Sequence, residues 1–237
     1  MNDIIKLSPR LLTAASYVKE GARVLDVGTD HAFVPIYLLQ KGRASFAAGS
    51  DINPGPLKTA KDNAVKFGLE NKLKLYLSDG LSLCECDENK YDHIIICGMG
   101  GELISSIIAS SPYSFRSGLR FILQPMTMPD KLRLFLSQNG FTVTDETIIK
   151  DGGKYYQFVV CEYFARPYTL SPTEMLLGRV NIEKRKNNST FYEYAGSLIR
   201  IYRQKIYGMK LGGENTETEG RIYSDLLELY KESGSDL

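Results

Sequence analysis

Short apolar runs alternate with amphipathic segments over the first two-thirds of the chain. Runs rich in β-branched and aliphatic residues predict buried strands, and segments with apolar residues at helical spacing predict helices. The predicted strands are 22–27, 45–52, 73–77, 91–97, 119–123, 141–149 and 155–163. The predicted helices are one that begins at Ser8-Pro9, 31–41, one that ends near Phe67, 101–110 and 128–138. Strand and helix alternate, which is typical of an α/β fold with a parallel sheet.

The last two predicted strands are joined differently from the others. Asp151-Gly152-Gly153 separates them, and glycine tolerates the positive φ angles that tight hairpin turns need. The sequence therefore predicts a parallel sheet that ends in an antiparallel hairpin.

The pattern changes again after Arg166-Pro167. Ser171-Pro172-Thr173-Glu174 has the form of a capping box, so we expect a long helix to start there. Apolar residues recur at helical spacing up to 206, the glycine-containing segment 208–213 interrupts them, and they resume from Ile222. We predict two domains: an α/β domain over 1–166 and an antiparallel helical, coiled-coil hairpin over 167–237.

Composition limits the class of protein. Hydrophobic residues make up 43% of the 237 residues and charged residues 24%, close to the average for soluble globular proteins. The first residues show no secretion signal, and no apolar run reaches the length of a membrane span. The four cysteines lack CxxC spacing and the two histidines are far apart, so we expect no metal site and no disulfide framework. We expect a cytoplasmic protein.

The net charge of +1 hides an uneven distribution near the C-terminus. Residues 166–210 are strongly basic, whereas the tail from Glu214 through Asp236 is strongly acidic. The basic residues of interest are Arg179, Lys184, Arg185, Lys186, Arg200 and Arg203.

The end of the first predicted strand carries acidic and small residues. In Asp26-Val27-Gly28-Thr29-Asp30 a carboxylate and a glycine lie where open α/β sheets bind their ligands. A nicotinamide cofactor would need GxGxxG here, but Asp30 and Phe33 occupy the positions of the later glycines. An acidic turn repels pyrophosphate, whereas it suits the sulfonium and ammonium groups of S-adenosylmethionine.

Two further aspartates end the next two strands. Asp51 is placed to accept hydrogen bonds from ribose hydroxyls, and Asp79, in Ser78-Asp79-Gly80, to accept one from an adenine amino group. Each alone could be an ordinary turn or cap residue. Together the three strand-end acids favour the class I Rossmann-like fold of S-adenosylmethionine-dependent methyltransferases. The candidate cofactor-binding residues are Asp26, Gly28, Thr29, His31, Asp51, Ile52, Asp79, Gly80, Gly98 and Met99, with a structural role as the favoured alternative for His31.

The fourth and fifth strand ends are the candidate substrate side. Gly98-Met99-Gly100-Gly101 stands where many related methyltransferases have an Asp/Asn-Pro-Pro-aromatic motif, and such a glycine turn lets a flat ring approach closely. A simple tight turn is the alternative. Gln124-Pro125 is predicted to face the same cleft, where the Gln124 amide could bind a base edge or the cofactor; a capped, buried strand end is equally compatible.

Several of these segments resemble one known family. Asp26-Val-Gly-Thr-Asp-His-Ala-Phe-Val-Pro35, Asp79-Gly80-Leu81, Gly98-Met-Gly-Gly101 and Leu123-Gln-Pro125 are similar to the bacterial tRNA (adenine-22-N1)-methyltransferases, and the resemblance covers nearly the whole chain. The family has Ser, Tyr and Leu where this chain has Thr29, Phe33 and Val34, and usually Asn in place of Met126. The segment expected to bind the cofactor, 26–35, therefore matches the family pattern better than the strand end expected to contact the substrate.

The resemblance implies transfer of a methyl group from S-adenosylmethionine to N1 of an adenosine in the D-arm of tRNA. It also implies a C-terminal coiled-coil hairpin. We assign Asp30 and Gln124 as catalytic candidates and Gly100, Pro125 and the six basic residues above as substrate-binding candidates. The alternatives are a methyltransferase with another substrate and a non-catalytic RNA-binding protein; for the basic face, the alternative is pairing with the acidic tail. We expect tRNA as partner, no membrane or metal, and a monomer, with weak self-association as the alternative.

Overall fold

The computed structural model describes residues 4–85 and 90–233, so Cys86 and Asp236 lie outside the described residues. The chain divides into two compact units, Met1–Tyr168 and Thr169–Leu237. Each unit has its own buried residues.

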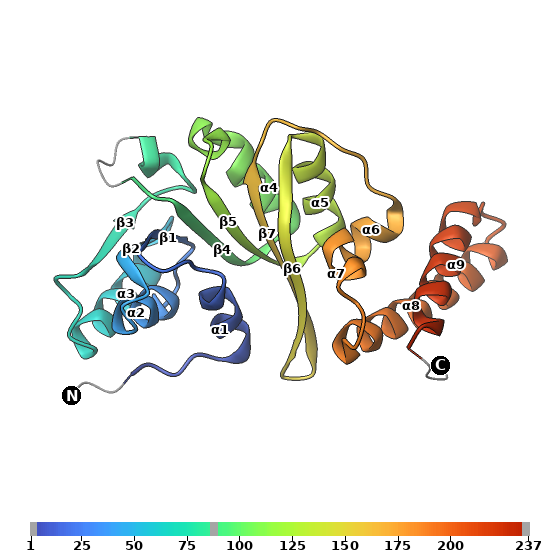
Figure 1. The fold of residues 1–237 in the computed structure, drawn as a ribbon, viewed down its shortest axis with the longest axis horizontal. Helices are drawn as coiled ribbons and strands as arrows, with labels where there is room; N and C mark the ends of the chain where they lie inside the picture. Colours follow the sequence, from blue (N-terminus) through green and yellow to red (C-terminus); the bar gives the residue numbers. More distant parts are fainter. Residues whose placement is uncertain (1–3, 86–89, 234–237) are drawn as a thin grey trace. The chain divides into compact units, whose positions relative to one another are not determined.

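The first unit is built around a seven-stranded sheet of order β3-β2-β1-β4-β5-β7-β6. Strands β1 to β5 run parallel, and β7 runs antiparallel to both β5 and β6 (Figure 1). This is the class I Rossmann-like architecture with a terminal hairpin that the sequence predicts. The strands are β1 (Ala22–Val27), β2 (Ala44–Asp51), β3 (Leu73–Leu77), β4 (His93–Gly100), β5 (Arg120–Thr127), β6 (Phe141–Asp151) and β7 (Lys154–Tyr163).

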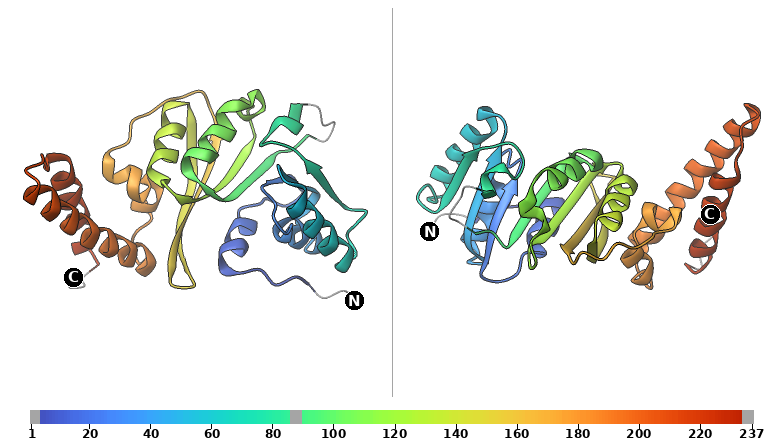
Figure 2. Two further views of the ribbon diagram at one scale, coloured as in Figure 1. Left: turned by 180° about the vertical axis from the view of Figure 1, so that it is seen from behind. Right: turned by 90° about the horizontal axis from the view of Figure 1, so that it is seen from above.

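Helices cover both faces of this sheet. Successive residues of a strand point to opposite faces, so Val24 joins one apolar cluster and Leu25 the other. The first cluster contains α1, α2 and α3; the second contains α4 and α5, which lie in front of the strands when the molecule is seen from behind (Figure 2). Burial on both faces explains the continuous apolar runs. The helices are α1 (Pro9–Ser16), α2 (Phe33–Gln40), α3 (Pro54–Lys66), α4 (Gly101–Ser110) and α5 (Pro129–Gln138), with short 3₁₀ turns η1 (Ser82–Glu85) and η2 (Pro112–Phe115).

The second unit is helical. The predicted capping box at Ser171 is present, but the helix it starts, α6 (Pro172–Leu177), is short. The prediction of one long helix from Ser171 is wrong because Gly178, at φ 88°, ends α6 before α7 (Arg179–Glu183) begins. The hairpin consists of α8 (Ser189–Leu211) and α9 (Glu217–Lys231). These two helices are antiparallel, since Lys205 pairs with Glu219 near the turn and Gly196 packs against Tyr230 farther from it.

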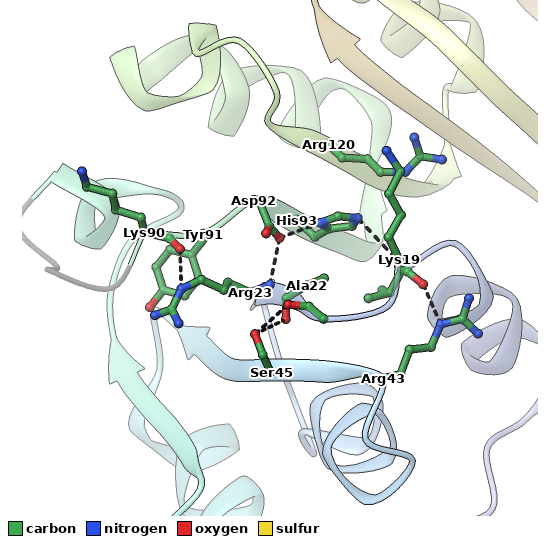
Figure 3. A network of polar contacts seen from close by, with 12 residues as sticks. Lys19, Ala22, Arg23, Arg43, Ser45, Lys90, Tyr91, Asp92, His93 and Arg120 are labelled. Carbon is green, nitrogen blue, oxygen red and sulfur yellow. Dashed lines mark hydrogen bonds and ion pairs between the residues drawn. The ribbon is translucent and has the colours of Figure 1, made fainter.

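Polar groups fix the N-terminal ends of the central strands (Figure 3). The Asp92 carboxylate accepts hydrogen bonds from the Arg23 amide at 2.8 Å and from Nδ1 of His93 at 2.7 Å. The Lys19 amide lies 3.4 Å from Nε2 of His93, which ties the loop after α1 to β4. This network aligns β1 with β4, so their opposite, C-terminal ends also lie side by side.

Candidate active site

A cavity of about 400 Å³ opens at the C-terminal ends of β1, β2 and β4. Its volume is within the range of small-molecule sites, roughly 300–1,000 Å³. The cavity collects predicted residues from three separate strand ends and adds others from α1, α2 and β5. It is lined by Arg10, Leu11, Asp26, Gly28, Thr29, Asp30, His31, Ala32, Phe33, Val34, Asp51, Cys97, Gly98, Met99 and Met126.

The turn after β1 is tightly held. The amides of Gly28 and Thr29 both donate to the Ser50 carbonyl, at 2.8 and 2.9 Å, so the turn is anchored to β2. Gly28 has a φ of 73°, and a Cβ atom on it would lie 2.2 Å from Cε of Met99. A side chain there would be strained and would fill the cavity, so glycine keeps the backbone open to a ligand.

Asp26 carries a buried carboxylate that receives little stabilisation from neighbouring groups. Its residue is 9% exposed, and the hydroxyl of Thr29 donates to it at 2.7 Å. Burial raises the pKa of Asp26 to about 7, and the Thr29 hydrogen bond opposes this shift. A cationic ligand would favour the ionised carboxylate, so this position suits a positively charged group.

The next two acids lie at the same edge of the sheet. Asp51 ends β2, lines the cavity, and accepts a hydrogen bond from the Asn53 amide at 2.8 Å. The Ser78 amide donates to the Asp51 carbonyl at 3.0 Å, which places Asp79 beside this strand end. Asp79 itself is exposed, its carbonyl accepts from Ser82, and neither it nor Gly80 lines the cavity. Ile52, 62% exposed, also lies outside it.

Asp30 and His31 form the outer rim. Their side chains, 72% and 46% exposed, approach to 3.1 Å between Oδ2 and Nε2. The His31 ring stacks on Phe33, with 5.1 Å between centroids. The positive φ of Ala32, 54°, delays the start of α2 to Phe33 and turns these side chains to the cavity.

The glycine-rich segment after β4 has two structural roles. Gly98 and Met99 line the cavity, whereas Gly100 caps α4 and does not. A Cβ atom on Gly101 would lie 2.2 Å from the carbonyl oxygen of Met128, so glycine is required for the backbones to approach.

Gln124 does not face the cavity, contrary to the prediction. The side chain is fully buried, and its Nε2 donates to the Pro125 carbonyl at 2.9 Å while its Oε1 accepts from Nη1 of Arg10 at 2.9 Å. Pro125 is buried beside it and does not line the cavity either. Internal hydrogen bonds thus occupy the Gln124 amide, which agrees with the alternative of a buried strand end and not with contact to a base or the cofactor.

Part of the cavity lining was not predicted from the sequence. Arg10 and Leu11 come from α1, which precedes the first strand, so no strand-end motif marks them. Cys97 and Met126 sit at strand ends, but an apolar residue there carries no chemical signal. The missed residues are Arg10, Leu11, Ala32, Phe33, Val34, Cys97 and Met126.

Residues 4–85 and 90–233 contain no group of three or more His, Cys, Asp or Glu side chains placed to hold a metal ion. No helix in that part of the chain combines the length and apolar character that a bilayer crossing demands.

In the helical unit, two of the six basic substrate-binding candidates pair with carboxylates. Arg179 pairs with Glu174 at 2.7 Å, and Arg185 binds both carboxylate oxygens of Glu232 at 2.7 and 2.8 Å. The alternative of pairing with the acidic tail therefore holds for Arg185. Arg200 and Arg203 are exposed on α8 and have no ion pair within the described residues. The exposed Lys184 and Lys186 flank Arg185.

Comparison with known proteins agrees with this geometry. Residues 7–159 match the model of a methyltransferase domain family. The chain is 31% identical to the tRNA (adenine(22)-N(1))-methyltransferase of Bacillus subtilis, over 98% of each protein. A Streptococcus pneumoniae protein assigned to the same modification, crystallised with S-adenosyl-L-methionine, is 28% identical with a TM-score of 0.83, covering 95% of this chain and 100% of that one.

A third similar structure is M. capricolum TrmK, in complex with the cofactor product S-adenosyl-homocysteine. It is 26% identical, with a TM-score of 0.76, and the match covers 95% of this chain and 97% of that one. The similarities extend over both units and include the strand ends that form the cavity. The chain therefore belongs to the bacterial tRNA (adenine-22-N1)-methyltransferase family.

Proposed function

We propose that this chain transfers a methyl group from S-adenosylmethionine to N1 of adenosine 22 in tRNA, in the cytoplasm where tRNA is found. The observation that carries the proposal is the match to the Bacillus subtilis enzyme over 98% of both chains, which includes the catalytic unit and the helical unit alike. A methyltransferase that acts on small molecules would need only the catalytic unit.

The residues of the cavity fit the proposed cofactor. S-Adenosylmethionine supplies an electrophilic methyl group on a sulfonium centre. Asp26 is a buried carboxylate whose ionised form a positive ligand would favour, and Asp51 lies at the neighbouring strand end with Oδ2 unused by the Asn53 amide. We assign Asp26 to the cationic part of the donor, Asp51 to the ribose and Asp79, beside it, to the adenine.

The acceptor needs positioning more than activation. The lone pair of adenine N1 lies in the ring plane and is already nucleophilic, so no residue has to remove a proton first. Holding the reacting groups in line therefore supplies most of the rate enhancement. The methylated ring is positively charged, and the exposed carboxylate of Asp30 at the rim of the cavity is placed to stabilise it. The target nucleotide must leave its stack to reach this site.

The helical unit offers a surface for the rest of the tRNA. Arg200, Arg203 and Tyr207 are spaced by three and four residues on α8, so they share one face of the helix. All three are exposed, and Tyr207 retains 67% of its accessible surface. Arginines that neutralise phosphates and an aromatic ring that stacks on a base are the usual means of binding RNA. We assign this face to tRNA, with Lys184 and Lys186 as further phosphate contacts.

Incubation of the full chain with unmodified tRNA and labelled S-adenosylmethionine tests the proposal. Label is expected in tRNA, and mass mapping should place it on adenosine 22. A tRNA with guanosine at position 22 is the control and should accept no label. Label on another nucleotide, or on protein or a small molecule only, would refute the proposed substrate.

A further inference from the structure

The β6–β7 hairpin extends past the strand beside it, at the edge of the sheet where the cavity opens (Figure 1). Strand β7 pairs with β5 only as far as Val159, whereas its pairing with β6 continues from Phe158 to Lys154. Since β6 is antiparallel to β7, it runs parallel to β5, and its last residue, Asp151, lies at the same edge as the C-terminal ends of β1, β2 and β4. At about 3.4 Å per residue, the part of β7 that β5 does not cover is roughly 17 Å long.

The hairpin is supported beside the cavity, but its tip is exposed. Oδ2 of Asp151 accepts a hydrogen bond at 3.2 Å from the amide of Arg10, a residue that lines the cavity. The Tyr156 ring packs against the first apolar cluster, and its centre lies 5.7 Å from the guanidinium carbon of Arg10. In contrast, a Cβ atom on Gly152 or Gly153 would meet nothing within 4 Å beyond its chain neighbours. The tip therefore stands clear of the rest of the unit.

Two lysines flank this tip. Lys150 ends in an amino group 5.4 Å from the centre of the Tyr155 ring on the opposite strand, and it is exposed. Lys154 is also exposed and forms no ion pair within residues 4–85 and 90–233. Lysines commonly protect an edge strand from pairing with another chain, which is the alternative role for both.

The rim of the cavity itself does not suit RNA phosphates. Asp30 is exposed there, its nearest cation is the His31 ring, and Asp51 adds a second carboxylate. The nucleotide to be methylated must enter the cavity from this edge, so the phosphates on either side of it remain outside. Carboxylates repel those phosphates, whereas lysines on a neighbouring projection can neutralise them.

We propose that the β6–β7 hairpin is a tRNA-binding element, in which Lys150 and Lys154 bind phosphates next to the methylated nucleotide. The inference rests on the proposed function. It adds a tRNA surface on the catalytic unit to the one assigned to α8. The two lysines anchor the tRNA beside the cavity and do not touch the reacting atoms.

The double variant Lys150→Gln/Lys154→Gln tests the proposal by filter binding of unmodified tRNA over a range of salt concentrations. The loss of two phosphate contacts should weaken binding by about tenfold and lower the slope of log K against log salt concentration by about two. In methylation assays KM for tRNA should rise while kcat stays unchanged, because the lost contacts are not specific to the transition state. Calorimetric affinity for S-adenosylmethionine should be unchanged, since neither lysine lines the cavity.

Lys72→Gln/Lys74→Gln is the matched control. It removes the same charge from exposed side chains at the start of β3, which lies at the other edge of the sheet. This variant should keep the tRNA affinity and the salt slope of the unaltered chain.

Three results would overturn the proposal. An unchanged salt slope in the hairpin variant would leave the lysines with protection of the edge strand, and an equal loss in the control would assign the effect to net charge. Weaker binding of S-adenosylmethionine in the hairpin variant would show that the lysines act on the cavity. Failure of the proposed function is distinguishable, since the unaltered chain would then leave adenosine 22 of tRNA unlabelled.

Discussion

Asp26 occupies a position where ionisation is costly without a ligand. In the unfolded chain its pKa would be 3.8, whereas burial raises it to about 7 in the folded protein. Between these values the folded state keeps a proton that the unfolded state releases, so this group's contribution to stability falls as pH rises from about 4 to about 7. The raised pKa of Asp26 therefore lowers the stability of the unliganded protein at neutral pH. The same buried carboxylate suits a cationic ligand.

Asp26→Asn should separate stability from binding. The amide cannot ionise, so at pH 8 the unliganded variant is expected to melt at a higher temperature than the unaltered chain. Its affinity for S-adenosylmethionine should fall by roughly ten- to a hundredfold, because a charged partner is lost. Calorimetric melting and titration measure both quantities. Unchanged affinity would remove Asp26 from the cofactor site.

Cofactor affinity should also depend on pH. Since the positive donor favours the ionised form of Asp26, its affinity is expected to rise as pH increases towards about 7 and to level off above it. Below that pH the slope can reach about tenfold per unit. Titrations from pH 5.5 to 8.5, in roughly half-unit steps around this pKa, check the profile. Asp26→Asn should give a flat profile, and a slope that persists in the variant would assign the effect to another group.

Asp30→Ala should affect turnover rather than cofactor binding. Asp30 lies at the exposed rim, so its charge is screened and its removal is expected to lower the methylation rate by about tenfold or less. Single-turnover methylation and cofactor titration separate the two effects. Equal losses in both would place Asp30 in the cofactor site.

Residues whose place follows from local order can be found from the sequence. Asp26, Asp51 and Gly98 each lie at or next to the C-terminal end of a predicted strand, and parallel strands bring such ends together. Arg10 could not be found in this way, because its place depends on how α1 packs against the β6–β7 hairpin, 141 residues away in the chain. The burial of Gln124 likewise depends on that packing.

The ends of strands agree with those predicted from the sequence where the apolar runs end sharply. The predicted ranges of β1 and β3 coincide with the observed ones. In contrast, β4 and β5 continue past their apolar runs, because Met99 pairs with Pro125 and Gly100 with Thr127. Backbone pairing, which does not depend on side-chain hydropathy, extends these strands into the segment that forms the cavity.

Helix α8 should contribute to tRNA affinity through its exposed arginines. The double variant Arg200→Gln/Arg203→Gln is expected to weaken tRNA binding and to reduce the slope of log K against log salt concentration by about two. Filter binding over a range of salt concentrations measures both. Arg221→Gln on α9 is the control, because Glu217 lies 3.7 Å from that arginine and already offsets its charge. An unchanged slope in the double variant would refute phosphate contacts by this face.

Across the whole molecule, the two units are expected to respond differently to the cofactor. The cavity is formed entirely by Met1–Tyr168, and Thr169–Leu237 has its own buried residues, among them Phe191, Ile199 and Leu226. A ligand stabilises the unit that binds it, by about 2.7 kcal/mol at a hundredfold excess over its Kd. Scanning calorimetry should show one transition that moves upward with S-adenosylmethionine and one that does not. A single transition that shifts as a whole would contradict independent units.

Carboxylates at neighbouring strand ends are proposed to hold a positively charged methyl donor. A crystal structure of this chain grown with S-adenosylmethionine would show the contacts of the donor. We expect the ligand in the cavity, with its sulfonium and amino groups near Asp26 and its ribose hydroxyls on Asp51. Ligand density elsewhere, with both aspartates free of contact, would contradict it.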